Sequence, residues 1–487
     1  MTGAVRIGCA SGFWGDTRAA AAQLVERGEI DFLVFDYLAE ITLSLLARAR
    51  SRRPEAGFVP DFVETLAPLL PEIARRGIKV VSNGGGMNPR AAAAALARRA
   101  ADEGLDLPIA VVTGDDLMPR EAELRRAGIV EMFTGEGLPE ALVSANAYLG
   151  ARPIARALEE GASIVVTGRC VDSAVTLAPL VHRFGWSWDD YDRLAAGSLA
   201  GHLLECGAQV TGGLFTDWEE VPGWDDMGFP IASCAPDGSF TISKPPGTGG
   251  LIAPLAVGEQ LLYEIGDPAA YHLPDVVCDF RHVTIRKTGP DEVLVEGARG
   301  RAPSGRLKVS ATWHDGYRTI GTVTIGGPDA ARKAEAVGRA VLARSRRLLG
   351  QAGLGDFTET SIEALGSEAT YGPHARAAAR ATREVVLKIG ARHPSEAALE
   401  ILAREIAPAA TAMAQGLTGF FAGRPGVQPV LRGFSFLWEA ARTPATVLIG
   451  DRAVEVASAP PGPDRGAGPE PEVVPAAPAA DAVEVPL

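Results

Sequence analysis

Polar residues that could bind a ligand follow five short apolar runs in the first part of the chain. The runs are VRIGCA, DFLVFDY, IKVVSNGG, IAVVTGDD and SIVVTGRC, and each ends among glycine and small polar residues. Glycines let backbone N–H groups approach a ligand closely, and a helix N-terminus that follows attracts anions. These segments predict a site for a small anionic molecule, and turn formation or helix capping is the alternative role of each residue. The candidate ligand-binding residues are Ser11, Gly12, Asp36, Asn83, Gly84, Gly85, Gly86, Gly114, Arg169 and Asp172.

Two adjacent aspartates, Asp115 and Asp116, are candidates for metal binding or general-base catalysis. Mg²⁺ needs only one or two carboxylates in addition to substrate and water oxygens. A like-charged neighbour raises the pKa of a carboxyl group, which suits a general base. Capping and turn roles are the alternative for both aspartates. Arg169 follows an apolar run directly, so it could pair with a carboxylate or phosphate of the ligand or form a structural salt bridge.

A second group of reactive side chains falls in the segment LAGHLLECGAQ. His202, Glu205 and Cys206 stand at i, i+3 and i+4, which places them on one face of a helix. His202 and Glu205 could act as a catalytic acid–base pair, and Cys206 as a nucleophile or metal ligand. The alternative is a histidine packed in the core beside a buried cysteine.

A glycine-rich segment, SKPPGTGG at 243–250, supplies a further candidate anion site. Lysine is rare in this chain, and Lys244 stands in an otherwise uncharged loop. Lys244, Gly247 and Gly249 are therefore predicted to contact an anionic ligand, and a proline-stiffened surface turn is the alternative. Two aromatic residues upstream, Trp218 and Trp224, either line an apolar pocket or pack between domains.

Several classes of protein find no support in the sequence. It contains no GxxxxGK[ST], no GxGxxG after a strand, no HExxH and no GxSxG, the motifs of nucleotide-binding enzymes, zinc proteases and serine hydrolases. The net charge of −13 repels nucleic acids and anionic lipids. No apolar run is long enough to span a membrane, and the first residues do not resemble a signal peptide. We therefore expect a cytoplasmic protein that binds neither nucleic acid nor membranes.

The elements that must position these residues follow an α/β pattern up to about residue 265. Continuous apolar strands alternate with helices, which predicts a doubly wound, mostly parallel sheet with helices on both faces. The predicted strands are 5–10, 31–37, 78–85, 109–116 and 163–170, and the predicted helices are 16–28, 61–77, 89–104, 138–149, 153–161 and 188–206.

The pattern changes in the second half. Antiparallel strands within 278–326, a helix at 328–350, strands at 358–365 and 384–391 and a helix at 394–409 predict a separate α+β domain. The domains are thus expected at 1–265 and 266–457. Residues 458–487 are rich in proline and alanine and predict a disordered tail.

Ten motifs together resemble one known family, that of acyclic terpene utilization protein A. The resemblance extends from about residue 5 to 455 and rests on GFWGD, FDYLAE, NGGGMNP, VVTGDDL, ANAYLGA, VVTGRCVDSA, LAGHLLECGAQVTGG, DWEEVPGW, GFPIA and SKPPGTGG. The resemblance implies bacterial catabolism of compounds such as citronellol and geraniol through CoA thioesters. It carries no agreed catalytic residues, so the candidates above rest on their positions alone.

These observations together predict an enzyme that acts on a small carboxylic acid or its CoA thioester by hydration, dehydration or another lyase-type proton transfer. The predicted catalytic residues are Asp115, Asp116, His202 and Glu205. If the enzyme uses a metal, Asp115 and Asp116 are predicted to bind Mg²⁺, and CoA is expected as part of the substrate. The alternatives are a ligand-binding or scaffold subunit without catalysis, and an acyl-CoA hydrolase that uses Cys206.

Two expectations concern partners. We expect a homo-oligomer. Relatives that resemble this chain continue into a small α+β domain beyond a VPL-type sequence, and this chain stops at 485–487. The resemblance therefore implies a separate partner subunit of about 100 residues, within the size range of small domains.

Overall fold

The computed structural model describes residues 3–420 and 423–462. The chain forms two compact units. Of the described residues, one unit contains 3–123, Asn146–Ser310 and 435–462, and the other contains Leu124–Ala145 and those within Ala311–Phe434. Residues 266–310, which the sequence analysis grouped with the second domain, thus pack with the first. Most of the predicted tail lies outside the described residues.

The first unit is built on a mixed sheet of 11 strands among the described residues. Its centre is parallel, in the order β1 (Val5–Cys9), β2 (Phe32–Phe35), β3 (Lys79–Ser82), β6 (Ile164–Thr167) and β4 (Ile109–Thr113). These are the five strands that the sequence predicted. Antiparallel strands extend both edges: β7 (Ile231–Cys234), β8 (Phe240–Ser243), β12 (Glu292–Glu296) and β11 (Thr284–Gly289) beyond β1, and β19 (Ala445–Ile449) and β20 (Arg452–Val456) beyond β4.

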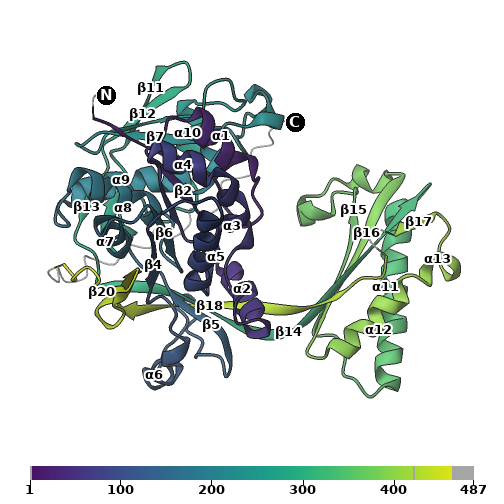
Figure 1. Cartoon of the computed structure of the whole chain (residues 1–487). Coiled ribbons are helices and arrows are strands. Elements are labelled where there is room, and N and C mark those ends of the chain that lie inside the picture. Colours follow the sequence, from purple (N-terminus) through teal and green to yellow (C-terminus); the bar gives the residue numbers. More distant parts are fainter. Residues whose placement is uncertain (1–2, 421–422, 463–487) are drawn as a thin grey trace. The chain divides into compact units, whose positions relative to one another are not determined.

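Helices cover both faces of the parallel strands, as a doubly wound fold requires (Figure 1). Alternate strand residues such as Leu33, Phe35 and Val80 pack into one apolar core with the helices of the first face. Those helices are α1 (Ala19–Arg27), α2 (Glu40–Arg52), α3 (Pro60–Leu66), α4 (Leu70–Arg76) and α5 (Pro89–Asp102). The other face carries α7 (Arg152–Glu159), α8 (Ala174–Phe184) and α9 (Tyr191–Glu205), which pack side by side. The α/β fold class is confirmed.

Smaller elements complete the first unit. Helix α10 (Pro254–Leu262) packs against α9, and β9 (Tyr271–His272), β10 (Val277–Asp279) and β13 (Arg299–Arg301) form a three-stranded antiparallel sheet.

The predicted helix at 138–149 is wrong. This segment forms strand β5 (Leu142–Ala147), which pairs with the long strand β14 (Arg306–Gly326). The hydroxyl groups of Ser144 and Thr312 lie 2.7 Å apart across this pair. Alanine and leucine favour a helix, but pairing with a distant strand overrides local propensity.

The second unit is an α+β layer. Strands β15 (Glu359–Leu365), β16 (Glu384–His393), β14, β17 (Leu417–Phe420) and β18 (Val427–Glu439) form its sheet. Helices α11 (Ala330–Gln351) and α12 (Glu396–Ile406) share an apolar core with this sheet. Strands β15 and β16 and helices α11 and α12 agree with the predicted elements, the two strands predicted within 306–326 form the single strand β14, and β17 and β18 were not predicted. The short helices α6 (Glu121–Arg126) and α13 (Ala409–Ala412) are the remaining α-helices in the described residues.

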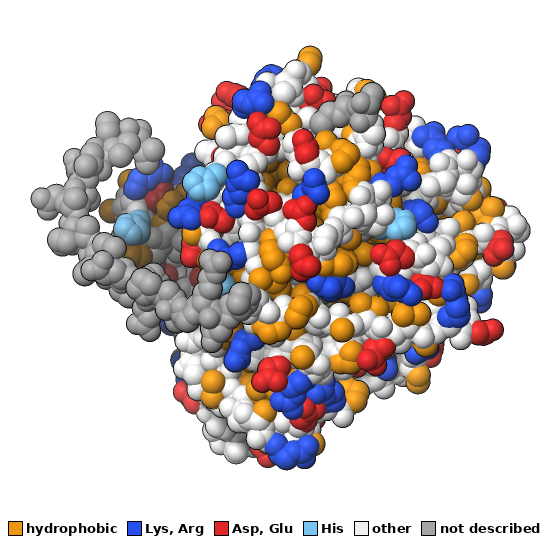
Figure 2. All heavy atoms as spheres, turned by 90° about the vertical axis from the view of Figure 1, so that its left-hand side faces the viewer, with side chains coloured by type: hydrophobic (Ala, Val, Ile, Leu, Met, Phe, Trp, Pro, Cys, Tyr) orange, Lys and Arg blue, Asp and Glu red, His pale blue; other side chains and the backbone are white. Residues whose placement is uncertain are grey.

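Two surface observations bear on the expected partners. Among the described residues, no helix combines the length and the apolar character that crossing a membrane requires. In the space-filling view of Figure 2, lysine and arginine side chains are interspersed with aspartate and glutamate rather than gathered into one area.

Candidate functional site

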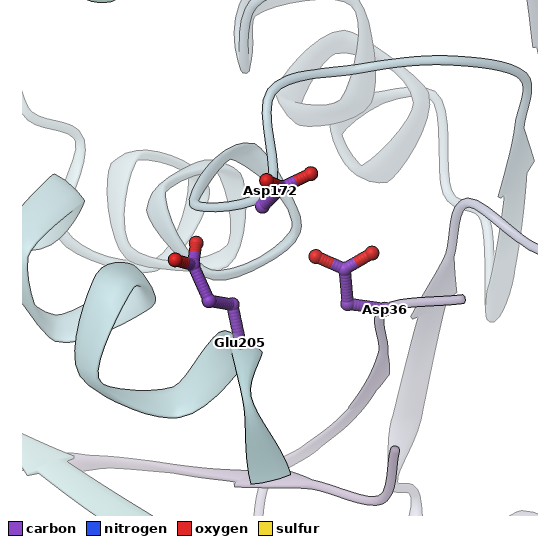
Figure 3. Close-up of side chains that lie close together, drawn as sticks. All are labelled: Asp36, Asp172 and Glu205. Atoms are coloured by element: carbon purple, nitrogen blue, oxygen red, sulfur yellow. The ribbon is translucent and has the colours of Figure 1, made fainter. Parts of the chain in front are cut away.

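Three carboxyl groups from distant parts of the sequence meet at the carboxyl end of the parallel sheet. Asp36 directly follows β2, Asp172 lies in the loop after β6, and Glu205 is the last residue of α9. One ligand atom from each lies within 4.8 Å of the others, and Figure 3 shows the three groups around one space. Asp36 and Glu205 are buried, and Asp172 is half-buried. We call this group the carboxylate cluster.

Hydrogen bonds from neighbouring strand ends hold Asp36 in place. The Asn83 side-chain amide donates to Asp36 Oδ1 over 2.6 Å, and Asn83 Oδ1 accepts from the backbone N–H of Tyr37 over 2.8 Å. The Ser11 hydroxyl donates to the Asp36 carbonyl over 3.0 Å. Ser11 and Asn83, both predicted as ligand-binding residues, thus fix the position of Asp36.

Arg169 brings a buried positive charge to the carboxylate cluster. Its side chain is almost completely enclosed, with 2% of the residue exposed. Nη1 donates to Asp172 Oδ1 over 2.8 Å and to the Leu38 carbonyl over 2.5 Å, and the guanidinium lies 4.0 Å from the centre of the Tyr148 ring. Among the described residues, its Nε has no hydrogen-bond partner. A buried charged donor without a partner is unusual in a folded protein, and an anionic group is the partner that it prefers.

His202 lies behind Glu205 and is buried. Its Nδ1 lies 2.9 Å from Glu205 Oε1, and its Nε2 lies 3.3 Å from the Leu261 carbonyl oxygen. A carbonyl only accepts hydrogen bonds, so Nε2 carries a proton and Nδ1 faces the glutamate. Protein groups thus occupy both ring nitrogens, and the catalytic role of His202 stays a prediction.

The electrostatics of the carboxylate cluster keep protons bound near neutral pH. Burial and the charges of Asp172 and Glu205 raise the pKa of Asp36, although Arg169 and Asn83 oppose the shift. Burial, with Asp172, raises the pKa of Glu205 to about 7 against the opposing effect of His202. Burial acts to lower the pKa of His202, but Glu205 outweighs it and the net pKa is raised. A carboxyl group that titrates near pH 7 can act as an acid or as a base.

Comparison with known proteins identifies the family. The sequence model of the family described as acyclic terpene utilisation family protein AtuA matches residues 5–449. This chain belongs to the AtuA family. Searches of curated proteins and of solved structures each returned no match.

The two aspartates predicted as metal ligands in this AtuA chain are not members of the carboxylate cluster. Asp115 is buried, and its Oδ2 accepts from the Arg169 backbone N–H and from the Asn146 side-chain amide, each over 2.8 Å. Burial raises the pKa of Asp115 to about 6. Asp116 accepts from the Met118 backbone N–H and faces Arg50 at 3.7 Å. Asp115 thus joins the ends of three strands, and its catalytic role stays a prediction, as does that of Asp116.

The strand-end glycines allow close approaches of the backbone. A Cβ atom on Gly12 would lie 2.6 Å from the Cys206 carbonyl carbon, so this glycine lets the end of β1 meet the end of α9. A Cβ atom on Gly85 would lie 2.6 Å from the Thr167 oxygen, and one on Gly114 would lie 2.6 Å from the Pro444 oxygen. Gly84 packs near Tyr37, and Gly86 has a positive φ. Their predicted contact with a ligand is not tested by this packing.

The Lys244 loop lies on the antiparallel extension of the sheet. The Lys244 ammonium donates to the Thr248 carbonyl over 2.9 Å and lies 3.5 Å from Asp291. Gly249 packs on the backbone of Gly223, and Gly247 has a positive φ with open space around it. The structure therefore gives Lys244 intramolecular partners, and anion binding by this loop stays a prediction.

A group of three side chains next to Arg169 was not predicted from the sequence. The Tyr148 hydroxyl donates to Glu40 Oε1 over 2.5 Å, and the Lys308 ammonium lies 3.0 Å from the same oxygen. Burial acts to raise the pKa of Glu40, but Tyr148, Arg169 and Lys308 lower it to about 2. Glu40 and Tyr148 lie within the family motifs FDYLAE and ANAYLGA, and these motifs could have indicated both residues as site candidates. Lys308 lies in a strand and has no such signal.

The raised pKa of Glu205 predicts a pH dependence of stability. Between its ordinary pKa of 4.5 and about 7, the unfolded chain has lost a proton that the folded chain retains. The contribution of Glu205 to the free energy of unfolding should therefore fall as the pH rises through this range and stay constant above it. His202, whose folded pKa is also raised, loses its contribution in the same direction as the pH rises through that pKa. Glu205→Gln should flatten this profile, which urea unfolding between pH 5 and 8 measures.

The exposed Glu103 offers a matched control, because Glu103→Gln removes one carboxylate outside the carboxylate cluster. That variant should keep the wild-type profile. Parallel profiles for the wild type and Glu205→Gln would contradict the titration assigned to Glu205.

Proposed function

We propose that this AtuA-family chain is an enzyme that moves a proton on a small carboxylic acid or its CoA thioester. The reaction class is hydration, dehydration or a related lyase step. The observation that carries the proposal is the carboxylate cluster, in which a glutamate with a pKa of about 7 lies near Asp172, and Asp172 pairs with a buried arginine that has an unused donor.

Glu205 is the proposed general acid–base group. In a dehydration, its carboxylate takes the proton from the carbon next to the carbonyl. The carboxyl group so formed then gives that proton to the hydroxyl group on the adjacent carbon, which leaves as water as the carbon–carbon double bond forms. His202 holds Glu205 in position and shares the proton, because its Nδ1 lies 2.9 Å from the carboxyl oxygen. Such proton transfer by a positioned side chain accelerates a reaction by a factor of about 10²–10⁴.

Arg169 is the proposed anchor for the substrate's carboxylate or thioester oxygen. Its Nη1 is occupied by Asp172 and Leu38, whereas its Nε has no partner among the described residues. A buried cation directed at developing negative charge stabilises the enolate that proton removal creates.

Mg²⁺ is the proposed cofactor, held by Asp36 and Asp172 rather than by Asp115 and Asp116, with Glu205 left free for proton transfer. Carboxylate oxygens are the ligands that this ion prefers, and one oxygen of each group lies within 4.8 Å of the other. A divalent cation would supply Lewis-acid stabilisation of the same oxygen that Arg169 contacts. Protons compete with the ion, since the pKa of Asp36 is raised.

A thermal-shift and native-mass screen tests this function. The probes are CoA thioesters and small hydroxy or unsaturated acids, with and without Mg²⁺, and a ligand of the folded state raises the melting temperature by mass action. Mg²⁺ alone should stabilise the wild type and Asp106→Asn, a control at an exposed aspartate, but not Asp36→Asn. A screen in which no acid or thioester shifts the wild type would count against the proposal. The predicted homo-oligomer and small partner subunit would appear in the same native spectra.

A further inference from the structure

An apolar surface on the first unit lies apart from the carboxylate cluster. Leu214, Trp218, Trp224, Leu255 and Leu262 are all exposed, and Leu214 has 88% of its surface open to solvent. The Trp218 and Trp224 rings lie 5.8 Å apart between centroids. Single exposed apolar residues are ordinary, but a group of large ones marks an interaction site. We call these five residues the tryptophan patch.

The spacing along α10 and one hydrogen bond bring members of the tryptophan patch together. Leu255, Glu259 and Leu262 stand at i, i+4 and i+7 of α10 and are all exposed. The Glu259 carboxylate accepts from the backbone N–H of Thr216 over 3.1 Å, which brings the segment between Leu214 and Trp218 against this stripe. A small core of Phe215, Val221 and Ala256 lies beneath and supports both segments.

Leu214 is held outward by an unfavourable backbone conformation. Its φ is +60°, in the left-handed region that a leucine rarely adopts. The folded chain gains no apolar burial from this side chain. Backbone strain of this kind persists where the surrounding structure imposes it and is typical of functional sites.

The border of the tryptophan patch is acidic. Asp217, Glu219, Glu220, Asp225 and Glu259 are exposed around the apolar residues. Lys244 is the only lysine or arginine between residues 194 and 280 of the sequence, and it is occupied by Thr248 and Asp291. Arg27 of α1 lies 3.5 Å from Asp226 beside this border, so the surface combines an apolar centre with a border that is predominantly acidic.

We infer that the tryptophan patch docks a partner polypeptide whose apolar side chains are bordered by lysine and arginine. Aromatic residues at the centre of an interface contribute most of its affinity, and opposite charges at the border speed association and set specificity. A second copy of this chain fits less well, because a symmetric contact would place the two acidic borders against each other.

A partner bound to the tryptophan patch would affect the carboxylate cluster through α10, because this helix contacts His202. The Leu261 carbonyl accepts from His202, and the Gln260 side-chain amide donates to the His202 carbonyl over 3.1 Å. Both residues lie on the helix that carries Leu255 and Leu262. A partner that shifts α10 would therefore change the position of His202, which contacts Glu205.

A peptide of leucine and lysine, with leucines at i, i+3, i+4 and i+7 of a helix, is the probe for this surface. Isothermal titration against the full chain should show binding that weakens as salt rises. Trp218→Ala and Trp224→Ala should each weaken it by about tenfold or more, as central aromatic residues do. Glu219→Gln with Glu220→Gln should weaken it less and reduce its salt dependence. Both tryptophans are exposed, so these variants retain the fold.

Matched controls separate docking from general attraction to an acidic protein. Phe133→Ala removes an exposed aromatic residue of the second unit and should leave binding unchanged. A peptide of the same composition with leucines on all faces, and a leucine–glutamate peptide of the same pattern, should not bind. The inference is overturned if the leucine–lysine peptide fails to bind, or if both tryptophan variants bind it as the wild type does. A dimer that Trp218→Ala dissociates would also overturn it, in favour of a second copy.

Discussion

Arg169→Met is expected to lower the free energy of unfolding of the first unit by about 3–5 kcal/mol, the usual result of removing one partner from a buried ion pair. The guanidinium is enclosed, contacts Asp172 and the Leu38 carbonyl, and stacks on Tyr148. Without it, three carboxyl groups remain together with no compensating arginine. Urea unfolding at pH 7 measures the loss.

Arg193→Met is the matched control for this experiment. Arg193 pairs with Asp190 over 2.7 Å, but its side chain is 44% exposed. A surface pair of this kind contributes about 0–1 kcal/mol. A loss below about 1 kcal/mol for Arg169→Met as well would contradict the role assigned to the buried arginine.

Glu205→Gln is expected to reduce turnover of the substrate found in the screen by about 10²–10⁴, the usual contribution of a general acid–base group. Glutamine keeps the size of the side chain but cannot accept the substrate proton. The wild-type rate should change with an inflection near pH 7, the pKa of Glu205, and rise above it if the glutamate acts as the base. Steady-state rates between pH 5 and 9 measure both effects.

His202→Asn distinguishes positioning from direct catalysis. The variant should keep measurable turnover, and its inflection should move, because the pKa of Glu205 depends on His202. Complete loss of activity in His202→Asn together with full activity in Glu205→Gln would reverse the two assigned roles.

The central parallel strands could be predicted from the sequence because each is a continuous apolar run that ends at a glycine or polar turn. Strand β5 could not, because its alanine and leucine content favours a helix and only pairing with β14 makes it a strand. The boundaries of the two units could not be predicted from the sequence either. Strands β19 and β20 come late in the chain but join the edge of the first sheet beside β4.

The candidate site was predicted in part as a group. Asp36 and Asp172 were both assigned to one site at the ends of the parallel strands, whereas Glu205 was assigned to a separate group on a helix, and no spacing in the sequence shows that it joins them. Their convergence depends on the close approach of Gly12 to Cys206 at the end of α9, a tertiary contact. Metal binding by Asp115 and Asp116 was predicted because they follow a parallel strand and supply carboxylate oxygens, and it stays a prediction.

Deuterium exchange tests the proposed reaction class most directly. The wild type, with Mg²⁺, would be incubated in D₂O with the panel of CoA thioesters and small hydroxy or unsaturated acids, and mass spectrometry would follow the carbon next to the carbonyl. We expect deuterium incorporation or addition of water for at least one compound. The same reaction should be lost in Glu205→Gln. Absence of both reactions across the panel, or exchange that persists unchanged in Glu205→Gln, would contradict the proposed reaction class.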